Sequence, residues 1–275
     1  MAYRELWWEF PDSIEHEYKW MGNYGAKGEK RAPKRKATPE QIAKQNQRIR
    51  EKKMRRLIKK NFRTGDMWCT LKYPKGTRLE AEMVKKDMKA FLDAMRKAYR
   101  ARGEPFKYIY RMEVGKQGGI HIHILCNRLT DKPVKGKPDT DTLIQRAWKA
   151  GRVNFTSLYD AGGYQQLAEY IVKKPDEQTE KQLTMIPEAE QKEFLRYSSS
   201  RNLIRPEPKQ REYKRRTLRK LRENGPEPTP GYYIDKNSIR SGVNPYTGLS
   251  YYQYIEYRIR AGDDRQDSPP WEVTG

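Results

Sequence analysis

The segment Gly118–Leu125 constrains the fold of this chain more than any other part; it reads Gly-Gly-Ile-His-Ile-His-Ile-Leu. The alternation of isoleucine with histidine predicts a β-strand, because residues two apart in a strand project from the same face of a sheet. His121 and His123 would then stand side by side on one face, and these are two of the three histidines in the chain. Two adjacent imidazoles form half of a metal site, so we expect the remaining ligand on a neighbouring strand.

The sequence on either side of this strand predicts alternating strands and helices, from its apolar periodicity and its turn residues. In chain order the expected elements are a strand at Met67–Tyr73, a helix at Leu79–Arg100, a strand at Phe106–Val114, the histidine strand Ile120–Cys126, a helix at Asp139–Ala150, a strand at Val153–Phe155 and a helix at Gly162–Lys174. This order predicts an α+β fold, with a ferredoxin-like or RRM-like antiparallel sheet and helices packed on it.

The charge of the chain indicates its class of partner. Its 275 residues carry a formal net charge of +22, which favours a polyanionic partner such as nucleic acid. A ribosome-associated or membrane-surface protein would share this charge. Aromatic residues make up 11 % of the chain, and aromatic side chains interleaved with basic ones suit single-stranded nucleic acid, whose bases stack on rings.

Segments outside the expected core differ from it in composition. Residues 1–22 are aromatic and acidic, whereas residues 27–63 hold sixteen Lys or Arg against three Glu. Thr38-Pro39-Glu40 marks the start of a basic helix, which is either a solvated surface helix or an arm on a DNA backbone. The expected division is an N-terminal aromatic segment and basic helical arm over 1–63, a core domain over 64–206, a basic helix (around Glu207–Arg222) and an extended aromatic segment over 207–260, and a disordered tail over 261–275. We also expect a strand at Arg196–Ile204 and a hairpin within Tyr232–Tyr257 whose turn is Asn244–Gly248.

Two classes of protein are disfavoured by the sequence. Cys69 and Cys126 are the only cysteines, so neither a disulfide framework nor a cysteine zinc site is expected, and a reducing cytoplasm is the simplest location. The N-terminus lacks a basic stretch followed by an apolar core, and no window approaches 18 apolar residues. We therefore expect neither secretion nor a membrane span.

Glu113 is the candidate for the missing metal ligand. If the hairpin between the two strands centres near Gln117, Glu113 lies directly opposite His121 and on the same face. Two imidazoles and one carboxylate would leave positions open for water and phosphate oxygens, which suits Lewis-acid polarisation of a phosphodiester.

A nucleophile is also required, and Tyr170 is the candidate, near the end of the last expected core helix. Lys173 and Lys174 follow at three and four residues, which on a continuous helix places them on the face of Tyr170. A nearby cation favours the phenolate and can contact a phosphate.

Three segments in this order resemble the motifs of HUH endonucleases, and more narrowly those of rolling-circle replication initiators of bacteriophages and plasmids. The segments are Thr70-Leu71-Lys72-Tyr73, then His121-Ile122-His123, then Tyr170 with Lys173. Glu113-Val114-Gly115 is similar to the acidic lead-in of those proteins, and Tyr197–Leu203 to a strand that follows their catalytic helix. The resemblance covers about Met67 to Pro206.

The resemblance implies a mechanism. His121, His123 and Glu113 would hold Mg²⁺ or Mn²⁺ against the scissile phosphate of single-stranded origin DNA. Tyr170 would attack it, leaving a 5′-phosphotyrosine and a free 3′-OH that primes synthesis. The expected partners are origin DNA and the helicase and polymerase of a bacterial host, in whose cytoplasm the protein would act. Residues expected to contact DNA are Thr70, Lys72, Tyr73, Lys116 and Arg201.

Departures from the family pattern leave alternatives open. Some members carry a second tyrosine four residues before the first, where this chain has Gln166, so we expect a single-tyrosine enzyme. No Gly-x-x-x-x-Gly-Lys-Ser/Thr motif is found, so unwinding would need a separate helicase. A mobilisation relaxase or a single-strand transposase would share these motifs. A nucleotide hydrolase of the HIT type needs a third histidine where this chain has Leu125, and a non-catalytic single-strand binding module would need neither metal nor Tyr170.

Overall fold

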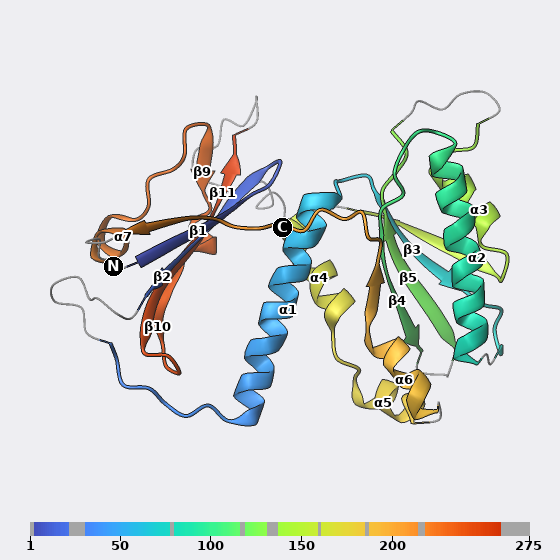
Figure 1. Cartoon of the computed structure of the whole chain (residues 1–275), viewed down its shortest axis with the longest axis horizontal. Coiled ribbons are helices and arrows are strands. Elements are labelled where there is room, and N and C mark those ends of the chain that lie inside the picture. The colour runs from blue at the N-terminus through green and yellow to red at the C-terminus, as the bar shows by residue number, and fades with distance from the viewer. Residues whose placement is uncertain are drawn as a thin grey trace, which may run out of the picture. The chain divides into compact units, whose positions relative to one another are not determined.

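The computed structural model describes residues 3–21, 31–77, 80–115, 119–130, 137–158, 161–184, 187–213 and 218–259. The chain divides into two compact units (Figure 1), one made of residues 1–45 and 206–275 and the other of residues 46–205. The tail expected over 261–275 lies outside the described residues, as does Lys116.

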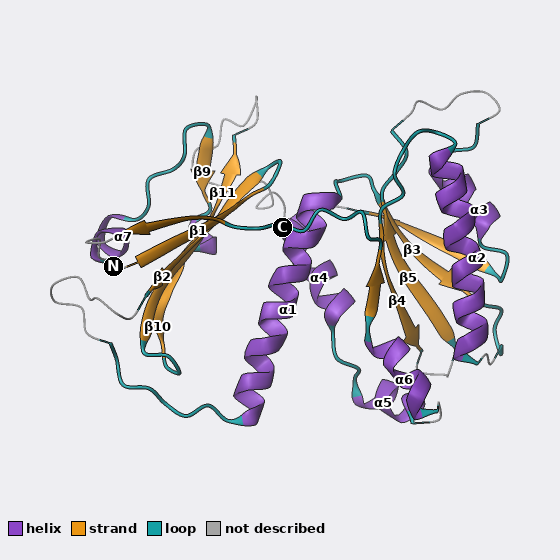
Figure 2. Ribbon diagram, viewed as in Figure 1, coloured by secondary structure: helices purple, strands orange, loops and turns teal. Residues whose placement is uncertain are grey.

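The unit of residues 46–205 is built on a five-stranded antiparallel sheet with the order β6-β3-β5-β4-β7 (Figure 2). Its strands are β3 (Met67–Lys72), β4 (Tyr108–Val114), β5 (Ile120–Cys126), β6 (Arg152–Ser157) and β7 (Tyr197–Ser199). Helix α2 (Ala81–Arg100) connects β3 to β4, and α3 (Thr140–Ala147) connects β5 to β6. This is the β-α-β-β-α-β order of a ferredoxin-like fold, and the expected α+β class is confirmed. Strand β7 extends the sheet beyond β4.

One face of this sheet packs against α2 and α3. Leu71, Ile122 and Ile124 project from that face and are fully buried, in one apolar cluster with Met88 and Met95 of α2. Each such side chain contributes about 1.5–3 kcal/mol when it leaves water. The isoleucines that alternate with the histidines therefore anchor the strand from the side opposite the imidazoles.

The other face is covered by α4 (Gln165–Val172) and by the second half of α1 (Pro39–Asn61), as Figure 1 shows. Met54 and Ile58 of α1 share an apolar cluster with Ile171 of α4 and with Ile109 and Leu125 of the sheet. A short 3₁₀ turn, η1 (Ala161–Tyr164), precedes α4, and α5 (Glu177–Leu183) and α6 (Glu188–Leu195) follow it. Polar residues on this second face therefore lie under helices rather than in open solvent.

The other unit joins the two ends of the chain in a six-stranded antiparallel sheet, with the order β10-β11-β2-β1-β8 and with β9 paired to β11. Its elements are β1 (Tyr3–Glu9), β2 (Ser13–Trp20), β8 (Lys209–Tyr213), α7 (Arg219–Asn224), β9 (Tyr232–Ile234), η2 (Lys236–Ser238), β10 (Arg240–Asn244) and β11 (Leu249–Arg258). The expected turn Asn244–Gly248 joins β10 to β11, where Gly248 has a φ of +66° that suits glycine.

Two expectations outside the core differ from the structure. The basic helix expected around Glu207–Arg222 is wrong at its start, because residues 209–213 form strand β8 along β1. Ion pairs of Arg4 with Glu212 and of Glu9 with Lys209 accompany this pairing, and basic composition alone does not separate helix from strand. The strand expected at Arg196–Ile204 is limited to Tyr197–Ser199.

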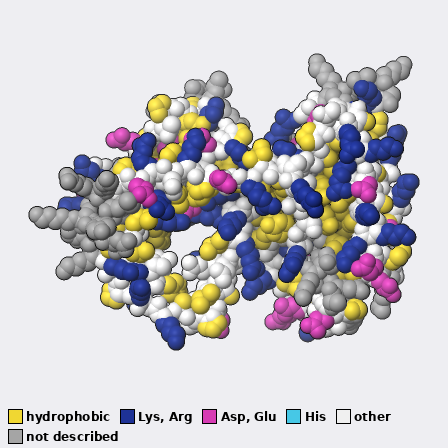
Figure 3. Space-filling model, in the orientation of Figure 1, with side chains coloured by type: hydrophobic (Ala, Val, Ile, Leu, Met, Phe, Trp, Pro, Cys, Tyr) yellow, Lys and Arg dark blue, Asp and Glu magenta, His cyan; other side chains and the backbone are white. Residues whose placement is uncertain are grey.

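The surface of the protein is basic over both units. Figure 3 shows Lys and Arg side chains spread over the visible face of each unit rather than gathered in one patch. In the described part of the chain, no helix is both long and apolar enough to cross a membrane.

His16 forms a buried charged cluster in the terminal unit. Its Nδ1 lies 3.2 Å from Glu5 Oε1, its Nε2 lies 3.8 Å from Glu256 Oε1, and its ring stacks on Tyr254. Burial acts to lower the pKa of His16, but hydrogen bonds to Glu256 and Glu5 and their charges raise it above 6.5. Burial likewise acts to raise the pKa of Glu5, but hydrogen bonds from His16 and two tyrosines lower it to about 2.

We predict that this unit loses stability as the pH rises through the raised pKa of His16. The protonated imidazole contributes fully below the ordinary pKa of 6.5, and its contribution disappears once the folded protein releases the proton. Hydrogen exchange of the β2 and β11 amides, followed from about pH 5 to pH 8, measures this after correction for intrinsic exchange. The substitution His16→Gln should flatten the profile. An unchanged profile in that variant would assign the pH dependence to other groups.

Candidate active site

The polar residues on the α4 side of the sheet come together through the strand register. Glu113 of β4 pairs directly with His121 of β5, as the sequence predicts, and Thr70 and Lys72 of β3 pair with His123 and His121. Because side chains alternate between the faces of a strand, all five project toward the side that α4 covers.

Tyr170 lies in the last turn of α4, and its hydroxyl reaches this face. The hydroxyl donates a hydrogen bond of 2.5 Å to Glu113 Oε2 and lies 2.8 Å from His123 Nε2. The join between the histidine hairpin and the tyrosine helix, predicted only from chain order, is therefore a direct contact. The phenol proton is used by Glu113, so Nε2–H of His123 donates to the phenol oxygen.

His123 is fixed from two further sides. Its Nδ1 lies 3.2 Å from Thr70 Oγ1, and its ring stacks on Trp68 at a centroid separation of 5.7 Å. Trp68 also meets Tyr170 edge-on at 5.9 Å. The imidazole, the phenol and the indole thus set one another's orientation.

Glu113 carries the negative charge of the site. Lys173 Nζ lies 2.5 Å from Glu113 Oε1 and 4.4 Å from the centre of the Tyr170 ring. Burial acts to raise the pKa of Glu113, but hydrogen bonds from His123, Lys173 and Tyr170 outweigh it and hold that pKa well below its usual range. The carboxylate is therefore charged throughout the neutral range.

The same carboxylate opposes ionisation of Tyr170. Burial, the hydrogen bond to Glu113 and the charge of Glu113 together raise the pKa of Tyr170 above its usual range, and only Arg111 acts to lower it. The expectation that Lys173 favours the phenolate is therefore not met in this state, because the lysine is paired with Glu113. Tyr170 is a neutral phenol until the negative charge of Glu113 is compensated.

Arg111 fastens α4 to the sheet beneath this site. It lies on β4 across from His123, is 3 % exposed, and donates from Nη1 to the carbonyls of Ile171 at 3.0 Å and Lys173 at 2.7 Å. A third carbonyl, that of Tyr170, lies 3.4 Å from the same nitrogen. A cation at the C-terminal end of a helix is favourable, since the free carbonyls there carry partial negative charge.

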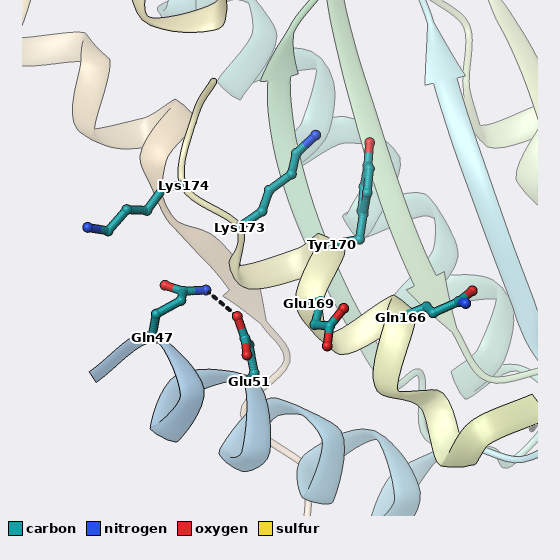
Figure 4. Close-up of a pocket in the computed structure, with 7 residues that line it drawn as sticks. All are labelled: Gln47, Glu51, Gln166, Glu169, Tyr170, Lys173 and Lys174. Atoms are coloured by element: carbon teal, nitrogen blue, oxygen red, sulfur yellow. Dashed lines mark hydrogen bonds between the residues drawn. The ribbon is translucent and has the colours of Figure 1, made fainter. Parts of the chain in front are cut away.

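A shallow hollow of about 480 Å³ lies on the other side of Tyr170, between α1 and α4 (Figure 4). Gln47 and Glu51 of α1 line it, and Gln47 donates to the carbonyl of Val172. In the figure, Tyr170 and Lys173 point away from α1, whereas Lys174 points in another direction.

The two lysines do not share the helix face predicted for them. Helix α4 ends at Val172, and Lys173 caps it in an extended conformation with ψ of 147°. This change of direction lets Lys173 fold back on Glu113, while Lys174 is exposed and has no contact with the site among the described residues.

The residues expected to contact DNA are divided by the structure. Thr70 and Lys72 belong to the face of the site. Tyr73 does not, because its hydroxyl bonds Asp87 of α2 and its ring packs on Trp148. Arg201 lies in the turn after β7 and lines a different hollow, and Lys116 is outside the described residues.

Three residues of the site were missed from the sequence. Trp68 and Arg111 each lie two positions before a residue that was selected, Thr70 and Glu113, so strand alternation was the available signal. Gly115 is the third: a Cβ there would lie 3.1 Å from Cε1 of His121, so glycine leaves room for that ring. No sequence pattern marks this last contact.

The donor set fits a divalent cation in its chemistry. One carboxylate and two imidazoles on adjacent strands are ligands that suit Mn²⁺, and Mg²⁺ through the carboxylate. The side chains are nevertheless not arranged as ligands, and among the described residues no group of three His, Cys, Asp or Glu forms a ready metal site. Glu113 and His123 instead bond the Tyr170 hydroxyl, which stands where a shared ligand would converge.

Comparison with known proteins gives one finding. There was no significant match among curated proteins or among solved structures. Residues 66–175, from the start of β3 to the end of the tyrosine helix, match the model of a family described as Replication-associated protein ORF2. The matched part contains Glu113, His121, His123 and Tyr170, and the match supports a role in DNA replication.

Proposed function

We propose that this protein starts DNA replication by nicking one strand of origin DNA, with Tyr170 as the nucleophile. The observation that carries the proposal is the Tyr170 hydroxyl, held between His123 and Glu113 at 2.8 Å and 2.5 Å. A tyrosine placed only for packing would not bring its hydroxyl to an imidazole and a carboxylate on one sheet face. The family match over the same residues adds the replication context.

In the proposed reaction the Tyr170 oxygen attacks the scissile phosphorus. A bond forms between that oxygen and phosphorus, and the bond from phosphorus to the 3′-oxygen breaks, so the products are a 5′-phosphotyrosine and a 3′-OH. The phenol proton leaves toward Glu113 or His123, the two groups already in contact with it. Attack of the 3′-OH on the phosphotyrosine reverses the step and rejoins the strand, since the ester conserves the bond energy.

His121, His123 and Glu113 are the residues that would hold Mg²⁺ or Mn²⁺, and the cation would polarise the phosphate and offset its charge. Burial and the Glu113 carboxylate both oppose ionisation of Tyr170, and positive charge beside Glu113 removes the second of these obstacles. Lys173 provides part of this compensation from the protein itself.

Related roles use the same chemistry. A mobilisation relaxase or a single-strand transposase would differ in its DNA substrate, and a non-catalytic binding module would not need the Tyr170 contacts. The replication role is favoured over the first two by the family match.

The first prediction concerns a covalent adduct. With Mn²⁺ and single-stranded or hairpin oligonucleotides that carry the origin sequence, the protein should form a protein–DNA adduct that survives denaturing electrophoresis. Tyr170→Phe should lower its yield by at least about 10³, because it removes the nucleophile and keeps the ring. His123→Ala and chelation of the metal should each lower it strongly.

Tyr164→Phe is the matched control, since Tyr164 is a buried tyrosine just before α4 and should keep the adduct. An adduct that persists in Tyr170→Phe would refute the nucleophile. No adduct on any origin substrate would favour the binding module.

The second prediction separates the neighbouring lysines. Lys173→Gln should slow adduct formation by about 10², as loss of one preorganised electrostatic group does in other enzymes. Lys174→Gln removes the same charge one residue later, from an exposed side chain, and should have a much smaller effect. Rates from single-turnover assays at saturating DNA decide this, and equal effects would mean that net charge rather than the Glu113 contact matters.

The third prediction assigns Arg111 as a positioning residue. Arg111→Met leaves the carbonyls at the end of α4 without their buried donor, so amides of α4 should exchange faster with solvent. The rate of adduct formation should fall while the affinity for DNA is retained, and Arg111→Lys should recover part of the rate. Equal losses of rate and affinity would indicate a general structural role instead.

A further inference from the structure

A second hollow in the unit of residues 46–205 is larger than the one beside Tyr170, at about 870 Å³. It lies between the C-terminal end of α2 and the turn that follows β7. Its floor includes Phe106 and Tyr108, which pack on each other, and its wall includes Ser199 and Ser200 of the sheet edge. None of these residues takes part in the site around Tyr170.

The charge around this hollow is positive. Arg96, Arg100 and Arg201 line it, and Arg96 is tied to Asp93 and to the Tyr108 hydroxyl. Within the part of the chain that the structure describes, the exposed side chains of Arg100 and Arg201 have neither an ion-pair nor a hydrogen-bond partner. Both guanidinium groups are therefore available to an anion.

The acidic group at the hollow does not neutralise these arginines. Of the described residues that line it, one is acidic, Glu104, and its Oε1 accepts hydrogen bonds from the backbone and hydroxyl of Thr130. Arg201 and Arg100 come from segments about a hundred residues apart in sequence, so the fold rather than a local charge run brings them together.

The hollow is connected to the tyrosine site by the strands of the sheet edge. Strand β4 runs from Tyr108 at the hollow to Glu113 at the site, a distance of about 17 Å at ~3.3 Å per residue. Strand β7 runs antiparallel beside it, with Tyr197 opposite Arg111 and Ser199 opposite Ile109. A stacked DNA strand covers this distance in about five nucleotides.

We propose that this hollow binds a backbone phosphate of the DNA strand several nucleotides away from the scissile bond. The inference rests on the proposed function, because it takes the strand from the tyrosine site along β4 and β7. Guanidinium groups suit a phosphodiester, since their paired N–H donors match its two free oxygens. A free phosphate offers the same chemistry, and the test below separates the two.

The test compares two oligonucleotides with the full-length protein. One ends less than about five nucleotides from the scissile phosphate on either side, and the other continues past the hollow in both directions. The variant is Arg100→Gln with Arg201→Gln, and its matched control is Lys86→Gln with Lys89→Gln, which removes the same charge from exposed positions of α2 outside the hollow.

We expect the arginine variant to bind the long oligonucleotide about tenfold more weakly at physiological salt. The slope of log K against log salt should become less steep by about 1.4, which is ~0.7 for each of two phosphate contacts on a single strand. The lysine control should lose much less. An arginine variant that binds the long oligonucleotide like the wild type, or only as weakly as the control, overturns the proposal.

Inorganic phosphate, titrated into the protein and followed by NMR shifts of the Arg100 and Arg201 amides, identifies the alternative ligand. Phosphate binding that depends on both arginines, with unchanged affinity for the long oligonucleotide in the variant, would assign the hollow to a free phosphate instead. Tyr170→Phe should keep the extra affinity for the long oligonucleotide although it forms no adduct. Failure of the nicking proposal and failure of the hollow proposal are thus distinguishable.

Discussion

The guanidinium of Arg111 joins the end of α4 to the centre of the sheet, and the geometry of the candidate site depends on that junction. It donates to carbonyls of the residues around Tyr170, and its charge lies beside both Glu113 and the phenol. A buried arginine is costly unless such acceptors surround it. Here those acceptors are the free carbonyls of a short helix, so satisfying the cation and fixing the nucleophile are accomplished by the same bonds.

The resting site holds its own nucleophile in an unreactive form. The Tyr170 hydroxyl bonds the carboxylate and the imidazole that would otherwise face a cation, and burial together with that carboxylate keeps the phenol protonated. Ionisation of Tyr170 and rearrangement of Glu113 are therefore one coupled event under the proposed function. This arrangement limits unwanted attack, because the phenol gains reactivity only when positive charge enters together with the phosphate.

The sequence predicted the core sheet well because its signals are local. Alternation placed His121, His123 and Glu113 on one face, and the strand Ile120–Cys126 was predicted with its observed bounds. The position of Lys173 was not predictable from helical spacing, because α4 ends at Val172 and the lysine turns back. The pairing of β2 with β11 was not predictable either, since no local pattern links residues near 16 to residues near 254. Arg111 was overlooked although strand alternation pointed to it.

The sheet made from both ends of the chain affects how the protein folds during synthesis. Strand β2 pairs with β1 on one side and with β11 on the other, and His16 stands across from Tyr254. At a synthesis rate of about 5–20 residues per second, β2 waits roughly 12–48 s for β11 to be made. During that interval the unit of residues 46–205 can complete its own sheet, whereas the first hairpin has an unpaired edge. The tyrosine-bearing unit is thus able to fold first, and the terminal unit must close a loop of more than two hundred residues afterwards.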